Sequence, residues 1–234
     1  MDLSIVIPTL HRVDTALLIA RRLSELLESE LAYEVVIVTP REPQGDAGER
    51  IRFVSDNGGG VYAAYWLGLR AARGEYVWFM GDDDYPLDSL RSLLSAIKAR
   101  NADLIVAPVI YSSGRLYKPS RSRLGLLFYN WCQQGILYRR SLILQMRFYK
   151  RLNVQADHYV NLVLRGNREL MIEYRDQPLC VFGAHGISSL GGDQSFRKLR
   201  PRLARRILPI LEFWLFLSIV KASDSYKFIL RLLR

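Results

Sequence analysis

Short apolar runs alternate with longer stretches of mixed polarity through the first 110 residues. The apolar runs predict buried strands at residues 3–8, 35–38, 51–54, 76–80 and 104–109. Between them, apolar residues recur with helical spacing at 13–30, 61–72 and 87–99. Strands that alternate with helices are typical of a parallel sheet with helices on both faces, so the pattern predicts an α/β fold.

The second half of the chain is less regular. Its periodicity predicts helices near 140–147 and 155–165 and strands near 169–174 and 178–183. A length of 234 residues fits one large domain, or one domain with an appendage.

The C-terminal forty residues differ from the body in charge. Ten of the 33 lysines and arginines, but only two of the 23 acids, lie in residues 195–234, so most of the formal charge of +10 belongs to this tail. Its apolar run, 207–220, is shorter than the roughly 20 residues of a spanning helix and is interrupted by Pro209 and Glu212. We expect an amphipathic helix on an anionic membrane surface. The alternative is a helix that packs on the body or on a second subunit.

Cysteine usage and the N-terminus bear on the compartment. The two cysteines, Cys132 and Cys180, cannot build a disulfide framework and lack the spacing of a metal site. The N-terminus has no basic segment ahead of a long apolar stretch, so we expect no secretory signal and a cytoplasmic location.

Three consecutive acids, Asp82, Asp83 and Asp84, follow the predicted strand 76–80. Adjacent carboxylates repel one another unless a cation or solvent relieves them. A divalent cation, Mn²⁺ or Mg²⁺, that also holds a substrate diphosphate would provide that relief, and ligands of α/β sheets bind at the carboxyl ends of strands. The alternative is a solvated turn in which Asp84 or Asp88 caps the helix that follows.

Five segments in a fixed order identify a family resemblance. They are SIVIPT at 4–9, SDNGGGVYAAYWLG at 55–68, ARGEYVWFMGDDD at 72–84, WCQQGILYRRSL at 131–142 and QADHYVNLVL at 155–164. Together they resemble the family 2 glycosyltransferases of the GT-A fold, and in particular the bacterial subgroup that builds exopolysaccharide and O-antigen. The resemblance covers roughly residues 3–190.

The resemblance implies an architecture and a reaction. It implies a GT-A catalytic domain over 1–195, followed by the basic amphipathic tail, 196–234. The reaction is transfer of a sugar, with inversion, from a nucleotide-diphosphate sugar to a hydroxyl group of a lipid-linked acceptor or a growing surface glycan. We expect the enzyme to lie on the inner face of the cell membrane, bound through its tail.

The resemblance also implies residue roles. Asp157 is expected to be the catalytic base, and Gln134 to lie on the acceptor side. The metal would be held by Asp82, Asp83, Asp84 and His185. The donor would contact Pro8, Thr9, His11, Arg12, Asp56, Asn57, Asp82 and Asp83. From the residues alone, Asp157 is equally readable as a helix N-terminal acid stabilised by the helix dipole, and His185 as a solvated loop histidine.

Three positions depart from the family pattern. Thr39, Pro40 and Arg41 stand where an aspartate usually holds the nucleobase, so that contact falls to Asp46 or Asp56 or is missing. Gly81 occupies the first position of the usual D-x-D-D motif, and Gln133 replaces a histidine. These departures bear on which nucleotide is bound more than on the class of reaction.

Three other functions compete with this interpretation. A nucleotidyltransferase would carry a glycine-rich phosphate loop after the first strand, and residues 8–12 contain no glycine. A non-catalytic membrane scaffold has no need of the acid triplet or Asp157. A nucleic-acid binder would suit the basic charge, but the basic residues interleave with a membrane-like apolar run, so we expect no nucleic-acid partner.

Overall fold

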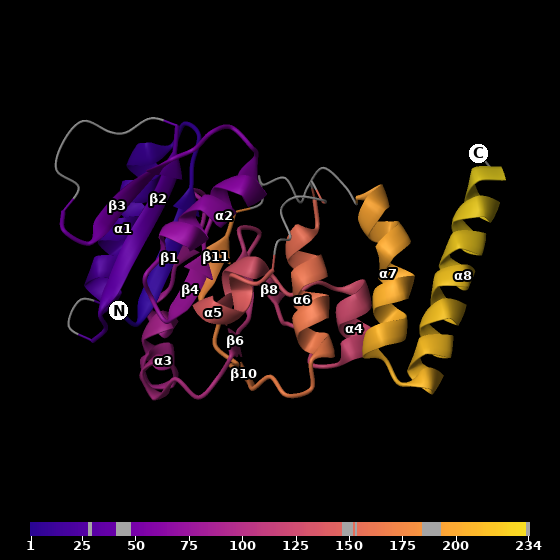
Figure 1. The fold of residues 1–234 in the computed structure, drawn as a ribbon. Coiled ribbons are helices and arrows are strands. Elements are labelled where there is room, and N and C mark those ends of the chain that lie inside the picture. Colours follow the sequence, from indigo (N-terminus) through magenta and orange to yellow (C-terminus); the bar gives the residue numbers. More distant parts are fainter. Residues whose placement is uncertain (28–29, 41–47, 147–151, 153, 184–192, 233–234) are drawn as a thin grey trace.

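The computed structural model describes residues 1–27, 30–40, 48–146, 152, 154–183 and 193–232, with side chains described up to residue 223. Its centre is a seven-stranded sheet with helices on both faces, and four further helices stand beside one another at one end of it (Figure 1). The predicted α/β class is confirmed.

The large sheet has the order β10-β6-β9-β4-β1-β2-β3. Its strands are β1 (Leu3–Pro8), β2 (Tyr33–Thr39), β3 (Ile51–Ser55), β4 (Tyr76–Phe79), β6 (Leu104–Val106), β9 (Ile136–Arg139) and β10 (Ile172–Tyr174). All neighbouring pairs are parallel except those of β9, which runs antiparallel to both β4 and β6. The carboxyl ends of β1 and β4 therefore meet at one edge of the sheet.

The faces of β1 explain why the sheet is covered on both sides. Ile5 and Ile7 point into one core with α1 (Val13–Leu27), while Val6 points into the other with α2 (Val61–Ala71). At Gly68 of α2, an added Cβ would lie 2.2 Å from Val6 Cγ1, so only glycine lets α2 approach the sheet this closely. The close packing fixes the start of α2 at the sheet edge that carries the site.

A smaller sheet lies beside the same edge. It has the order β5-β11-β7-β8, with β5 (Tyr85–Pro86), β7 (Val109–Tyr111), β8 (Leu116–Tyr117) and β11 (Cys180–Phe182). The predicted strand 104–109 is thus divided between β6 of the large sheet and β7 of the small one. Pro108 stands at the break, where a residue without an N–H group cannot continue a central strand.

Several predicted elements are shorter than the sequence pattern indicates. The predicted helix 87–99 is a 3-10 helix, η1 (Asp88–Leu93), followed by α3 (Leu94–Ala99). The predicted helix 140–147 is the single turn α5 (Arg140–Ile143). The predicted strands 169–174 and 178–183 are confirmed as β10 and β11, although they belong to different sheets.

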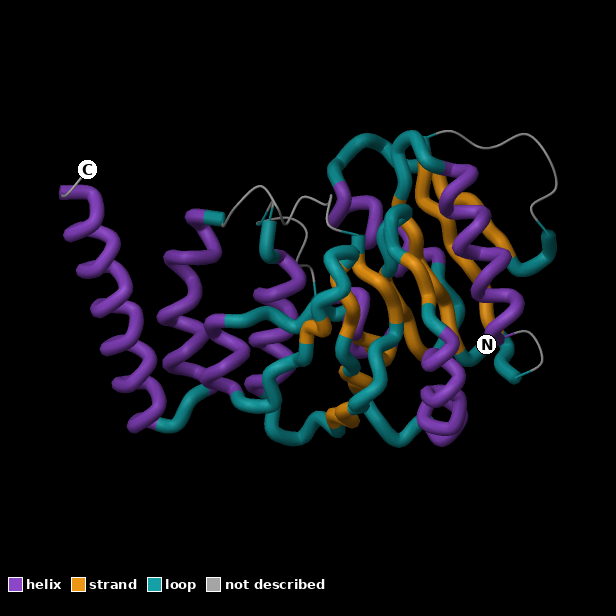
Figure 2. Tube along the Cα trace, turned by 180° about the vertical axis from the view of Figure 1, so that it is seen from behind, coloured by secondary structure: helices purple, strands orange, loops and turns teal. Residues whose placement is uncertain are grey.

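The helices at the end of the sheet are α4 (Arg123–Phe128), α6 (Ala156–Gly166), α7 (Gln194–Ile207) and α8 (Ile210–Leu232), with α8 outermost (Figures 1 and 2). The division expected at residues 195 and 196 falls in the first turn of α7. The apolar residues of α7 lie in the same core cluster as α6, and they are Phe196, Leu203, Ala204 and Ile207. Helix α7 is therefore packed as part of the body.

Helix α8 buries one side and exposes the other. Phe216 is fully buried, its ring lies 5.5 Å from that of Phe128, and Arg200 of α7 stacks over both rings. The opposite side exposes a row of apolar residues, Ile210, Leu211, Trp214, Leu215 and Ile219. Over the described part of the chain, no helix is long and apolar enough to cross a membrane.

Candidate active site

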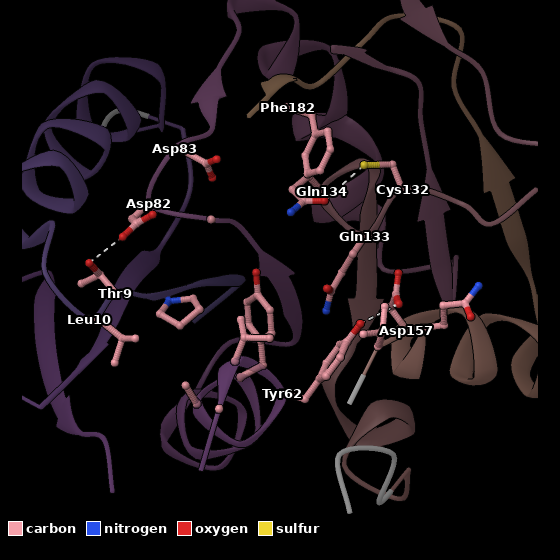
Figure 3. A pocket seen from close by; sticks show the side chains of 18 of the residues that line it. Thr9, Leu10, Tyr62, Asp82, Asp83, Cys132, Gln133, Gln134, Asp157 and Phe182 are labelled. Atoms are coloured by element: carbon pink, nitrogen blue, oxygen red, sulfur yellow. Dashed lines mark hydrogen bonds between the residues drawn. The ribbon is translucent and has the colours of Figure 1, made fainter. Parts of the chain in front are cut away.

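A cleft of about 850 Å³ opens at the sheet edge where β1 and β4 end. Its walls come from residues 8–12 at the end of β1, the first turn of α2, residues 130–134 and the start of α6. A further wall comes from the turn of residues 81–84 after β4, which we call the acid turn. In Figure 3, Thr9, Asp82 and Asp83 lie on one side of the cleft, and Gln133 and Asp157 lie on the other. The sheet edge predicted to hold the ligand is the edge where the cleft lies.

The loop after β1 is tied to the acid turn. Thr9 donates a hydrogen bond from its hydroxyl to Asp82 Oδ2 at 2.7 Å and accepts one from the backbone N–H of Arg12 at 3.0 Å. The Arg12 guanidinium lies 3.9 Å from Asp82 Oδ1. Pro8 and His11 line the cleft beside them. The structure thus brings these four predicted donor-binding residues together with Asp82.

The three consecutive acids do not share one environment. Asp82 and Asp83 line the cleft, whereas Asp84 is 3% exposed and does not line it. Asp84 accepts hydrogen bonds from the backbone N–H groups of Gly81 and Gly183. Burial raises the pKa of Asp84 to about 7, against the opposing effect of these two hydrogen bonds. In the described structure, Asp84 fastens the end of β11 to the acid turn.

Gly183 is the last described residue before 184–192, the segment that contains His185. An added Cβ at Gly183 would lie 2.2 Å from Asp83 Oδ2, so the acid turn and this backbone are in direct contact. His185 itself lies outside the described residues, and its predicted role stays a prediction. Within the described ranges, no group of three or more His, Cys, Asp or Glu side chains is arranged to hold a metal ion.

The glycine-rich turn before α2 carries the second predicted nucleotide contact. Asp56 lines the cleft, and its Oδ1 accepts a hydrogen bond from the backbone N–H of Gly58 at 2.9 Å. Its own N–H donates to Thr39 O, which places Asp56 beside the end of β2, where the family aspartate is missing. Asn57 does not line the cleft, and Asp46 lies outside the described residues.

Asp157 stands in the first turn of α6 and lines the cleft. Its Oδ1 accepts a hydrogen bond from the Tyr62 hydroxyl at 3.0 Å, and its Oδ2 accepts one from Asn130 Nδ2 at 2.5 Å. Burial and the Asp157 charge both raise the pKa of Tyr62, so its phenol keeps the proton that it donates. The sequence analysis missed both partners, which lie 95 and 27 residues away along the chain.

His158 follows Asp157 but makes a different set of contacts. Its ring is 3% exposed, lies 4.7 Å from the ring of Phe196, and places Nε2 2.6 Å from Leu126 O. Burial lowers the pKa of His158, against the opposing effects of the Leu126 contact and the Asp157 charge. His158 therefore joins α6 to α4 and α7 as a neutral, buried side chain.

Gln134 lines the cleft as predicted for the acceptor side, although it is largely buried. Its Oε1 accepts a hydrogen bond from Cys132 Sγ at 3.1 Å, and its side chain also bonds Asp84. Its carbonyl accepts one from Trp78 Nε1 at 2.8 Å, which ties the segment to β4. Burial strongly raises the pKa of Cys132, so this thiol is no nucleophile.

Three aromatic rings of the small sheet form a further wall of the cleft that the sequence did not predict. Tyr111 lies edge to face with both Tyr117 and Phe182, with ring centroids 5.5 Å apart in each pair. The Tyr117 hydroxyl donates to the carbonyl of Asn130, whose side chain holds Asp157. The wall therefore continues from the acid turn toward Asp157.

Proteins of known class share the sequence pattern and the fold of this chain. The model of glycosyl transferase family 2 matches residues 4–160. The chain therefore belongs to glycosyl transferase family 2.

Curated relatives agree with this assignment. The chain is 30% identical, over 174 residues, to a PGL/p-HBAD biosynthesis glycosyltransferase of Mycobacterium bovis (strain BCG / Pasteur 1173P2). The alignment covers 70% of this chain and 68% of that protein. The protein of the same name from Mycobacterium tuberculosis (strain ATCC 25177 / H37Ra) matches to the same extent.

Solved structures show the same fold at low sequence identity. S. aureus TarS (1–349) in complex with UDP superposes with a TM-score of 0.66 and 17% identity, covering 88% of this chain and 65% of that one. Glucosyl-3-phosphoglycerate synthase from Mycobacterium tuberculosis, in complex with Mn²⁺, UDP-glucose and phosphoglyceric acid, gives a TM-score of 0.55 and 17% identity. That match covers 88% of this chain and 80% of the synthase. The chain thus spans about two thirds of the length of the TarS fragment.

Proposed function

We propose that this chain transfers a sugar from a nucleoside-diphosphate sugar to an acceptor hydroxyl group, with inversion at the anomeric carbon. The observation that carries the proposal is the arrangement of carboxylates around one cleft. Asp82 and Asp83 line the wall that follows β4, and Asp157 lines the opposite wall at the start of α6. The first wall would therefore hold the charged leaving group, and the opposite wall would supply the group that accepts the proton.

The donor would lie along the first wall. Residues 8–12 and Asp56 would contact the nucleoside, and Arg12 the diphosphate. Asp82 and Asp83 fit a divalent cation such as Mn²⁺ or Mg²⁺, because their carboxylates supply hard oxygen ligands and Gly183 leaves room for Asp83. When bound there, the cation would offset the negative charge that builds on the departing nucleoside diphosphate. Glucosyl-3-phosphoglycerate synthase was solved with Mn²⁺ and UDP-glucose, which supports this assignment.

The transfer itself is a direct displacement. The acceptor oxygen forms a new bond to the anomeric carbon from the side opposite the diphosphate, and the bond from that carbon to the diphosphate oxygen breaks with its electron pair. The acceptor proton passes to Asp157, whose carboxylate is held in the cleft wall by the Tyr62 and Asn130 hydrogen bonds. Attack from the opposite side is what inverts the configuration.

The acceptor would be a lipid-linked or growing surface glycan, met at the inner face of the cell membrane. Support comes from α8, whose outer side exposes Leu211, Trp214 and Leu215 to solvent. Arg205 and Arg206, at the end of α7, are exposed immediately before this helix. Exposed apolar side chains next to cations suit the headgroup region of an anionic membrane.

The test is a panel of nucleoside-diphosphate sugars, each offered with Mn²⁺, with Mg²⁺ and with EDTA. Thermal unfolding reports binding, because a ligand at 100 times its Kd stabilises the folded state by about 2.7 kcal/mol. We expect at least one donor to raise the unfolding temperature only when a divalent cation is present. An equal response with EDTA would contradict the metal assignment, and no response to any nucleoside diphosphate would contradict the donor class.

A further inference from the structure

The hydrogen bonds that hold Asp157 continue into the protein core. Asn130 Oδ1 accepts a hydrogen bond from Asn161 Nδ2 at 3.0 Å, and Asn161 Oδ1 accepts one from the Tyr138 hydroxyl at 2.9 Å. Asn161 and Tyr138 are 0% and 1% exposed, so water does not compete for these groups. A continuous series, or chain, of side-chain hydrogen bonds therefore runs from Tyr138 of β9 to the Asp157 carboxylate at the cleft.

The direction of this chain is set at its buried end. Burial raises the pKa of Tyr138 well above its usual value, so the phenol keeps its proton and donates it to Asn161. An amide that accepts through its oxygen presents its NH₂ group on the other side, so Asn161 donates to Asn130. By the same logic Asn130 must turn its NH₂ group toward Asp157. Every proton in the chain thus points toward the carboxylate.

The positions of these residues follow from the local fold. Asp157 and Asn161 are four residues apart on α6 and so share one face of the helix. Asn130 lies between α4 and the 3-10 helix η2 (Gln133–Gly135). In the described structure its side-chain amide joins Asn161 to the Oδ2 atom of Asp157.

Among the described residues, the titratable groups around Asp157 are neutral near pH 7. They are Tyr62 and Tyr65 of α2, Tyr117 of β8, Cys132, Tyr138 of β9 and His158 of α6. Burial raises the pKa of each phenol and of the thiol, and lowers the pKa of His158. Within this part of the chain, oriented dipoles face the Asp157 carboxylate.

We propose that Asn130, Asn161 and Tyr138 are positioning residues that hold the Asp157 carboxylate aimed at the acceptor hydroxyl. The inference rests on the proposed function, in which Asp157 is the base. This series of hydrogen bonds, in which every donor points toward Asp157, has two effects that water around the carboxylate would not have. It prevents Asn130 from turning its oxygen toward Asp157, and it holds the carboxylate in one rotamer.

The test reverses the polarity of the chain with Asn161→Asp. A carboxylate at position 161 can still accept the hydrogen bond from the Tyr138 hydroxyl, but it cannot donate one to Asn130. The Asn130 amide should therefore rotate so that its NH₂ group faces residue 161 and its oxygen faces Asp157. We expect kcat of transfer to fall about 10- to 100-fold, with donor Kd unchanged within a few-fold. The acid limb of the kcat–pH profile should move to higher pH, because an acceptor facing Asp157 favours its protonated form. A purely structural role would leave that limb in place.

Two further variants keep the test decisive. Asn167→Asp, at the exposed C-terminal end of the same helix, makes the same chemical change away from the chain and should leave kcat and the pH profile unaltered. Tyr138→Phe removes only the hydroxyl at the buried end; if Asn161→Asp fails to fold, this variant should still lower kcat severalfold and shift the acid limb. Wild-type kcat and pH profile in Tyr138→Phe and in folded Asn161→Asp would overturn the inference. If, in addition, Asp157→Asn keeps normal turnover, the assignment of the base falls as well.

Discussion

The hydroxyl of Thr9 donates a 2.7 Å hydrogen bond to Asp82, and this bond joins the ends of two strands that are 73 residues apart along the chain. Strands β1 and β4 are parallel neighbours, so their carboxyl ends meet and the loop after β1 contacts the acid turn. The Arg12 guanidinium, 3.9 Å from the same carboxylate, adds positive charge at this point. The loop after β1 and the acid turn thus form one continuous wall of the cleft.

The first prediction concerns the acid turn. Asp82→Ala combined with Asp83→Ala should abolish cation-dependent binding of a nucleoside diphosphate, because the two carboxylates of the acid turn that line the cleft are lost. Isothermal titration calorimetry with UDP and Mn²⁺ measures the effect. Asp88→Ala is the matched control, since Asp88 follows the same strand but is exposed and paired with Arg22 outside the cleft. Undiminished Mn²⁺-dependent binding in the double variant would contradict the metal assignment.

The second prediction is a pH dependence of stability that arises from His158. Burial lowers the pKa of His158 in the folded state below its ordinary value of 6.5. The unfolded chain therefore takes up a proton that the folded chain resists, so the contribution of His158 to the free energy of unfolding should decrease as the pH falls below about 6.5. Above that pH both states are neutral, and His158 contributes no slope. Asp84 contributes the opposite slope, because its raised pKa lets the folded chain take up a proton before the unfolded chain does.

Chemical denaturation between pH 5 and 8 measures this slope. His158→Gln should remove the His158 contribution, so that this variant loses less stability, or gains more, than the wild type between pH 8 and pH 5. His11→Gln should keep the wild-type profile, because His11 is exposed. The same pH dependence of stability in the wild type and in both variants would refute the assignment of a buried neutral histidine.

The third prediction concerns the outer side of α8. Leu211→Glu combined with Trp214→Glu should greatly weaken binding to vesicles that contain anionic lipid, because both side chains are exposed and their apolar transfer is lost. Co-sedimentation at low and high salt measures binding, which in the wild type should need anionic lipid and weaken with salt. Point substitutions are preferred to a deletion after Leu199, since α7 contributes Leu203, Ala204 and Ile207 to the core.

Leu18→Glu on the exposed side of α1 is the control for this experiment, since it changes an equally exposed leucine far from the tail along the chain. It should leave vesicle binding unaltered. If the α8 variant binds vesicles like the wild type but converts a dimer to a monomer, the outer side of α8 is a subunit interface instead.

The sequence predicted most of the scaffold because hydrophobic periodicity reports which faces are buried. The apolar run of β1 and the helical spacing of α1 were sufficient for this, since β1 is buried along its length and α1 is buried along one side. The antiparallel insertion of β9 between β4 and β6 left no such signal, because a strand buried on both faces looks the same in either direction. The packing of α7 was also hidden, because its few buried apolar residues lie among six basic ones.

The site was predicted only as far as its residues carry a local signal. Three adjacent aspartates cannot be told apart in sequence, and what separates Asp84 from the others is the backbone of Gly183, 99 residues further along the chain. Asn130 and Tyr62 were missed for the same reason, since neither residue has a local feature that connects it with Asp157. Asp157 itself was found through the resemblance to the family.

The central claim is that Asp157 removes the proton from the acceptor hydroxyl, and single-turnover transfer by Asp157→Asn tests it most directly. The matched control is Asp14→Asn, because Asp14 also stands in the first turn of a helix and would respond equally if the role were only to stabilise the helix dipole. We expect Asp157→Asn to bind the donor within a few-fold of the wild type and to transfer the sugar about 100-fold more slowly or worse, while Asp14→Asn behaves as the wild type. A near-normal transfer rate in Asp157→Asn would contradict the account.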